Sequence, residues 1–327
     1  MNNLKKVGLT ALAGTLAALS AQAGELTVTG SAEISYVQRD NDEITGNPIG
    51  MNKNIAFAGS GELDNGWTVS ISQGTNDAFG FSSASVSIGM GSLGTITVDG
   101  GTGADIGNAL DNVVPTAFEE ADAGMATGLV DSGGVISNHG SIKYALPEFS
   151  GAKLYVGYNP RNGSAAAADG ATGGEVGGGG RAYEFGADFS PEMIPGLRVG
   201  GVFGTCNDCV AGSTDLDEET WFATYAYGPL SVGYQTADED EGTTSYDTDV
   251  YGVSFNVNDA LSVSYQYGET NGYAGGVQAE FEGVSAAYNI GPMAIKFTHN
   301  EGKNINGITS GVNQDDTNRE LNLSMSF

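Results

Sequence analysis

Apolar and polar residues alternate with a period of two along most of the chain beyond residue 24. In the stretch ELTVTGSAEISY (25–36), Leu26, Val28 and Ile34 fall on one face of an extended strand, and polar residues fill the other face. A period of two is the main sequence signal of a half-buried strand, and the 3.6-residue period of a helix is almost absent. The pattern therefore predicts an all-β protein.

Sixteen alternating segments follow one another, joined in turn by short and long connections. The short connections carry turn residues, as at Gly228-Pro229 and Gly291-Pro292, and the long ones are acidic, as in 40–50, 206–219 and 237–247. An even number of strands with turns at one rim and long loops at the other is typical of a transmembrane antiparallel β-barrel.

The polarity of the second face favours a membrane barrel over a soluble one, because charged residues would be costly in a dry core. In a barrel with lipid outside and water inside, these residues line the lumen, and closure pairs every backbone group. The predicted lumen bases are Lys143, Lys153, Arg198 and Lys296, and Arg39 is a further candidate. The predicted lumen acids are Glu33, Glu62, Asp99, Glu184, Asp188, Glu280, Glu282 and Glu320. The apolar parity changes at 282–284, which predicts a bulge there.

One connection, 100–140, is much longer than the others. A loop of this length is normally either functional or disordered, and the apolar residues Leu110, Val113, Val114 and Phe118 favour a folded loop. The segment contains no Lys or Arg, and its acids are Asp105, Asp111, Glu119, Glu120, Asp122 and Asp131.

The first 23 residues have the pattern of a secretory signal peptide. Lys5 and Lys6 precede the apolar run 7–19, and the small residues 21–23 form a cleavage site. We expect residues 1–23 to be removed and 24–327 to form a single barrel domain. No later stretch approaches the roughly 18 apolar residues of a transmembrane helix.

Charge and glycine content are both unusual. The formal net charge is −28, and removal of residues 1–23 makes it more negative by two. Such a charge opposes binding to nucleic acid, and an acidic surface suited to high salt is an alternative explanation for it. The 52 glycines, with only 8 prolines, fit closely packed strands and tight turns.

The chain has two cysteines, Cys206 and Cys209. In an exported protein this spacing favours a local disulfide that pins a loop. Unpaired thiols and redox or metal chemistry are the alternatives.

Candidate chemistry is sparse. The two histidines, His139 and His299, lack the partners of a nucleophilic triad, so we predict no enzyme activity, no catalytic residues and no cofactor. The acidic runs 215–219 and 238–241 offer oxygen ligands for Ca²⁺ but lack EF-hand spacing, so we assign no metal site beyond weak binding of Ca²⁺ by these loops.

A signal peptide, sixteen alternating strands, a long loop after the fifth strand and a C-terminal phenylalanine resemble the general porins of Gram-negative outer membranes. The segment ALDNVVPTAFEEA (109–121) is similar to the alphaproteobacterial type. The resemblance implies that loop 100–140 folds into the lumen and constricts a channel for passive diffusion of ions and small hydrophilic solutes. It also implies a homotrimer in contact with outer-membrane lipid and lipopolysaccharide, and a role for Phe327 as a signal to the outer-membrane assembly machinery.

The charge of the predicted constriction departs from this family, which commonly sets an acidic loop against a basic cluster. Carboxylate rings favour cations in a pore, so we predict weak to moderate cation selectivity. The predicted constriction residues are Asp105, Asp111, Glu119, Glu120 and Asp122. Alternatives are carboxylates that bind a divalent ion or are only solvated, a substrate-selective channel with Tyr155 or Phe222 as a binding track, and a plugged barrel that acts as an adhesin or receptor.

Overall fold

The structure is a computed structural model. It describes residues 26–40, 47–75, 80–99, 106–110, 112–130, 134–136, 140–161, 180–210, 214–274, 276–309 and 314–327. The predicted signal peptide, 1–23, lies outside the described residues.

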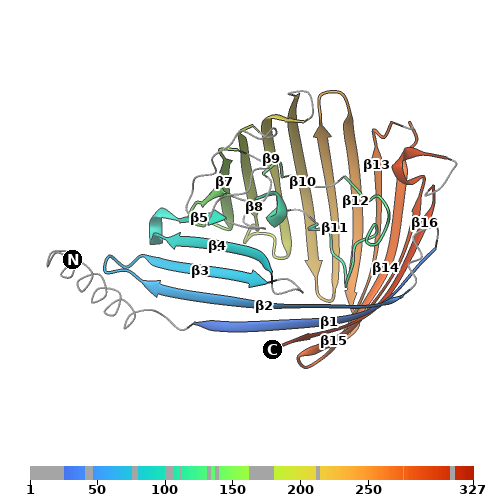
Figure 1. Cartoon of the computed structure of the whole chain (residues 1–327), viewed down its shortest axis with the longest axis horizontal. Helices are drawn as coiled ribbons and strands as arrows, with labels where there is room; N and C mark the ends of the chain where they lie inside the picture. Colours follow the sequence, from blue (N-terminus) through green and yellow to red (C-terminus); the bar gives the residue numbers. More distant parts are fainter. Residues whose placement is uncertain are drawn as a thin grey trace, which may run out of the picture.

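Sixteen strands close into one antiparallel barrel, in which each strand pairs with its neighbours in sequence and β1 pairs with β16 (Figure 1). The all-β transmembrane barrel with sixteen strands is therefore confirmed. The strands are β1 (Thr27–Asp40), β2 (Ile49–Glu62), β3 (Thr68–Thr75), β4 (Phe81–Gly89), β5 (Thr95–Asp99), β6 (Ser141–Ala145), β7 (Ala152–Asn159), β8 (Ala182–Phe189), β9 (Leu197–Val210), β10 (Thr214–Tyr227), β11 (Leu230–Asp240), β12 (Ser245–Asn256), β13 (Leu261–Asn271), β14 (Ala279–Ile290), β15 (Met293–Lys303) and β16 (Asp316–Ser326). In the described part of the chain three short helical turns accompany them: η1 (Gly91–Leu93), α2 (Gly107–Leu110) and η2 (Ile305–Gly307).

The two ends of the described chain form the seam of the barrel. Gly30 donates its backbone N–H to the carbonyl of Phe327 at 2.7 Å, and Phe327 donates to the carbonyl of Gly30 at 3.0 Å. The ring of Phe327 lies against Gly30, so close that a Cβ on Gly30 would be 2.5 Å from Cε2. The seam thus uses a residue without a side chain to seat the terminal ring.

The two faces of the barrel wall differ as the alternation predicts. Outward side chains are apolar and exposed, for example Ile71 and Leu321, whereas the inward residues Gln235 and Asn300 are buried and polar. This arrangement places apolar groups toward lipid and satisfies the backbone by closure. None of the helical turns in the described part of the chain has the length or hydropathy to cross a bilayer.

Several details of the sequence prediction are wrong. The acidic segments 206–219 and 237–247 are largely strand, because β9 to β12 continue beyond the apolar zone. The expected bulge at 282–284 is also absent, since β14 pairs with both neighbours in unbroken register. The apparent change of parity arises because Phe281 faces inward, where it is fully buried.

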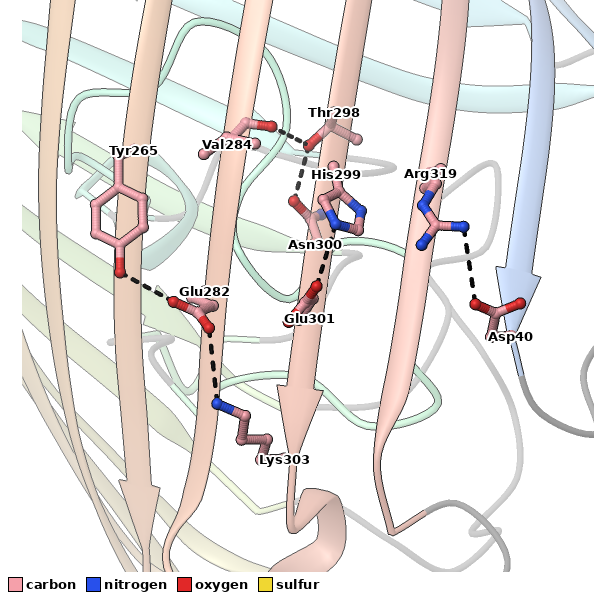
Figure 2. Close-up of polar contacts among 10 residues, drawn as sticks. All are labelled: Asp40, Tyr265, Glu282, Val284, Thr298, His299, Asn300, Glu301, Lys303 and Arg319. Carbon is pink, nitrogen blue, oxygen red and sulfur yellow. Dashed lines mark hydrogen bonds and ion pairs between the residues drawn. The ribbon is translucent and has the colours of Figure 1, made fainter.

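The same register corrects the placement of Glu280 and Glu282, which face outward at the loop rim instead of into the lumen. Figure 2 shows Glu282 between Tyr265, which donates a hydrogen bond to it at 3.2 Å, and Lys303, whose Nζ is 3.7 Å away. In the same view His299 lies beside Glu301. These residues form a polar outer belt above the apolar wall.

Candidate functional site

The described parts of the connection between β5 and β6 lie inside the barrel along its inner wall (Figure 1). Ile106, which directly precedes α2, and Leu110 of α2 pack against Val202 and Phe222 of the wall. These four side chains are almost fully buried, so the loop enters the lumen anchored on a small apolar cluster. We call residues 106–136 the constriction loop.

Glu184 of β8 holds both ends of the constriction loop. Its Oε2 accepts the backbone N–H groups of Ile106 at 2.9 Å and Gly107 at 3.3 Å, and its Oε1 accepts that of Ile136 at 2.7 Å. Glu184 is fully buried. Hydrogen bonds from three backbone donors explain how a carboxylate is accommodated at this depth.

The middle of the constriction loop is bound by polar side chains from successive strands. Gln235 of β11 accepts the N–H of Val113 at 3.2 Å, Ser285 of β14 accepts that of Phe118 at 3.0 Å, and Gln266 of β13 accepts that of Ala121 at 2.6 Å. The wall thereby supplies the acceptors that an irregular backbone segment lacks.

The tip of the loop reaches the far side of the barrel. Asn300 of β15 donates to the carbonyls of Glu120 and Ala123 at 2.8 and 3.0 Å, and Asn318 of β16 donates to Ala123 at 3.0 Å. Tyr273 donates to the carbonyl of Gly128 at 3.0 Å. The loop therefore lies along the wall from β8 to β16.

The returning end of the loop packs on the disulfide. Cys206 and Cys209 are bonded to each other, and Val135 and Ile136 pack with Cys206 and Ala182. The predicted disulfide is present, but it lies at the loop-rim end of strand β9 instead of in a loop.

Among the predicted constriction acids that the structure describes, Glu119 lies beside several charged groups. Burial raises its pKa above the usual range of a glutamate, and the negative charges of Glu320 and Glu33 raise it further, while Lys296 opposes them. The Nζ of Lys296 lies 3.8 Å from Glu33 Oε1 and 4.7 Å from the ring centroid of Phe118. Glu119 of the loop thus faces charged residues of β1, β15 and β16.

Asp122 is arranged differently from Glu119. Its Oδ2 accepts the backbone N–H of Leu129 at 2.8 Å, and burial raises the pKa of its carboxyl. The carboxylate of Asp122 therefore accepts a hydrogen bond from within the loop itself. Glu120 contributes its carbonyl to the bond from Asn300. Asp105 and Asp111 lie outside the described residues.

The lumen wall residues fall on the inward positions of their strands. Arg198 forms two hydrogen bonds with Asp188, at 3.0 and 3.1 Å, and stacks on Phe222, whose ring centroid is 4.8 Å away. The Nζ of Lys153 lies 3.7 Å from Oε2 of Glu148, near the rim that carries the short turns. Lys143 shares the lumen parity of β6 with Ser141, and Asp99 of β5 is almost fully buried.

The amides that fasten the loop, Gln235, Gln266, Asn300 and Asn318, are the functional residues that the sequence alone did not reveal. Their signal would be a Gln or Asn at an inward position of a strand, but the same residues suit any wet lumen. Within the described residues no group of three or more His, Cys, Asp or Glu side chains is placed to hold a metal ion.

A closed barrel with an apolar exterior, a polar interior and a loop fastened across its inner wall defines a transmembrane diffusion channel. The family model described as Gram-negative porin matches residues 8–325, and the chain belongs to this family. The protein is therefore a general diffusion channel of the outer membrane, in a family of channels and not of enzymes.

Solved structures agree in fold at low sequence identity. An anion-selective porin from Comamonas acidovorans is 18% identical with a TM-score of 0.63, covering 93% of this chain and 100% of that one. OmpF of Salmonella typhi in complex with daunomycin is 12% identical with a TM-score of 0.70, covering 93% and 98%. A mutant of the Rhodopseudomonas blastica porin is 14% identical with a TM-score of 0.65, covering 93% and 100%. No curated protein sequence matches the chain.

Proposed function

We propose that this porin is a passive channel for ions and small hydrophilic solutes with a weak to moderate preference for cations. The observation that carries the proposal is the group of charges around Glu119. Among the described residues whose charges act on Glu119, Glu320, Glu33 and Asp122 are acidic and Lys296 is basic. Unbalanced carboxylates beside a narrow passage favour cations.

Two bases of the opposite wall contribute little to offset this group, because each of them is paired with an acid. Arg198 is paired with Asp188, and Lys153 with Glu148. The anion-selective porin from Comamonas acidovorans shares the fold, so the barrel fold alone does not imply cation selectivity.

The reversal potential of single channels in a KCl gradient tests the proposal. We expect a potential of the sign that marks cation preference, reduced by Glu119→Gln and increased by Lys296→Gln. A potential of the opposite sign for the wild-type channel would show that the assignment is wrong.

The arrangement of the aromatic residues supports diffusion over a substrate-binding track. Phe222 is only 4% exposed and lies beneath Arg198 and the loop residue Ile106, so its ring is not offered to a solute. Liposome swelling with solutes of graded size should show rates that depend on size without saturation.

We also propose a homotrimer in which the outer face of β4 and β5 contacts a second copy. β5 and β6 have five residues each, fewer than the roughly 9–11 with which a strand spans a bilayer. Outward positions on β4 and β5 are aliphatic, as at Val86 and Val98, whereas aromatic residues such as Trp221 and Tyr234 face outward on the longer strands β10 and β11.

Val86→Arg should reduce the trimer to monomers in detergent. Val232→Arg, on the outer face of β11, is the control.

We retain two further proposals from the sequence: cleavage after residue 23, and contact of the outer wall with lipid and lipopolysaccharide. The N-terminal sequence of the mature protein tests the first, and lipid analysis of protein purified from outer membranes tests the second. Contact of Phe327 with the outer-membrane assembly machinery is tested below.

A further inference from the structure

The constriction loop lies close to the barrel wall at several positions where the wall has no side chain. Beneath the loop, several strands each place a glycine at an inward position. These glycines include Gly157 on β7, Gly186 on β8, Gly204 on β9, Gly233 on β11, Gly252 on β12, Gly268 on β13 and Gly283 on β14.

At three of these positions the glycine faces backbone or proline-ring atoms of the loop, which cannot rotate away. A Cβ on Gly252 would overlap Cγ1 of Val114 and lie 3.0 Å from the carbonyl oxygen of Pro115. One on Gly283 would lie 2.5 Å from Oδ1 of the wall residue Asn300 and 2.9 Å from the Cα of Ala121. A Cβ on Gly233 would overlap the ring of Pro115. Backbone atoms and a proline ring yield only if the loop itself moves.

At Gly268 an added methyl group would meet less resistance than at the other three positions. A Cβ there would meet Cδ1 of Leu129 at 2.7 Å, the end of a flexible side chain that can adopt another rotamer. An alanine at this position should therefore be tolerated better than one at Gly283.

The hydrogen bonds that hold the loop down come from positions next to these glycines on the same inward face. On β11, Gln235 is two residues from Gly233, and on β14, Ser285 is two residues from Gly283. Successive inward positions of a strand are two residues apart. Each of these strands thus combines one position that lets the loop approach with one that binds it.

We infer that Gly233, Gly252 and Gly283 set the distance between the constriction loop and the wall, and so determine the size limit of the channel. Optimal separation of carbon atoms is about 3.5–4.0 Å, so one added methyl group displaces the loop toward the open lumen by roughly 1 Å. The inference rests on the proposed function as a diffusion channel.

The experiment compares Gly252→Ala and Gly283→Ala with the wild-type channel and with Gly50→Ala. Gly50 is an inward glycine of β2 away from the loop, where the new methyl group would meet only the hydroxyl of Ser35, at 2.6 Å. Single-channel conductance and the exclusion of neutral polyethylene glycols of graded size are measured on folded protein in planar bilayers.

We expect the two loop-facing variants to conduct less, by roughly 1.2- to 2-fold, and to exclude smaller polymers, since pore diameter governs passage. Gly50→Ala should match the wild type. If either loop-facing variant fails to fold, Gly268→Ala supplies a milder test of the same direction.

Conductance and polymer exclusion equal to those of Gly50→Ala would overturn the inference. A larger, fluctuating conductance would also overturn it, because it would mean that the loop detaches instead of shifting inward. A wild-type protein without conductance steps would count against the proposed function, which is a different result.

Discussion

Glu184 accepts the backbone N–H of Ile136 at 2.7 Å, and through its other oxygen it accepts the N–H of Ile106 at 2.9 Å. One side chain of the wall thereby joins the first and last described turns of a loop whose ends are 30 positions apart in sequence. The loop is closed at its base on β8, and its length is fastened across the wall as far as Asn318 of β16.

Glu184→Gln should loosen both ends of the constriction loop. The amide nitrogen is a donor, so at least one backbone N–H loses its acceptor, at a cost of about 1–3 kcal/mol for a buried group. We expect faster hydrogen exchange at Ile106 and Ile136 and a less steady single-channel conductance. The control is Asp188→Asn, which removes a carboxylate from the same face of β8 that contacts Arg198.

If Glu184→Gln and Asp188→Asn had the same exchange rates at these two amides, Glu184 would not be the residue that secures the loop.

Cation preference should weaken with acidification at a higher pH than an ordinary glutamate would give. The pKa of Glu119 is raised, chiefly by burial and then by Glu320 and Glu33, so this carboxyl gains its proton early as the pH falls. Reversal potentials recorded across a pH series measure the effect. Glu119→Gln should remove this early phase, and retention of the phase in that variant would assign it to another group.

Asp122→Asn should leave the selectivity close to that of the wild type. The Asp122 carboxylate accepts the backbone N–H of Leu129 within the loop, and the side-chain oxygen of an asparagine can accept the same N–H. Burial raises the pKa of Asp122 in the folded state, so its contribution to stability is greatest at low pH and declines as the pH rises through that raised pKa. The variant should therefore be as stable as the wild type, or slightly more stable, at neutral pH, as thermal unfolding in detergent will show.

A shift in reversal potential as large as that of Glu119→Gln would instead place the Asp122 charge in the ion path.

Reduction of the disulfide should have a small effect. Cys206 and Cys209 are three positions apart, and the closed loop is so short that the entropic contribution is only about 2 kcal/mol. Thermal unfolding of a Cys206→Ser, Cys209→Ser double variant should shift modestly, with unchanged conductance. Loss of conductance would show that the packing of Cys206 on Val135 and Ile136 is needed to hold the loop.

The strand pattern predicted the barrel because lipid imposes a period of two on every outward residue. The same rule misplaced Glu280 and Glu282, since beyond the apolar zone an outward residue is polar and parity alone cannot tell rim from lumen. Phe281 was wrongly expected to face outward because it is apolar. Its ring faces inward and packs on Ala121 and Ile305, and this apolar contact inside a wet barrel depends on the folded loop.

Within the site, the sequence identified the loop but not how it is held. The length and apolar content of 100–140 distinguish a folded insertion from a disordered loop. The positions of its anchors depend on which strand each part of the loop crosses, and that register is set by contacts between residues more than 100 positions apart, such as Val113 with Gln235. Asp122 and Glu119 are similar in sequence context, and only the fold of the loop separates an internal acceptor from a charge beside the wall.

Deletion of Phe327 should impair insertion into the outer membrane more than it impairs the finished channel. The ring is 80% exposed and rests on Gly30, so it contributes little buried area to the folded barrel. The seam also has many other paired residues, from Ser31 with Ser326 to Asp40 with Thr317. Protein refolded in detergent should therefore conduct like the wild type, whereas the amount inserted in cells should fall severalfold. Gly30→Val, which crowds the ring but keeps it, serves as the matched variant. Equal losses in refolding and in cellular insertion would show that Phe327 acts through the stability of the seam and not as an assembly signal.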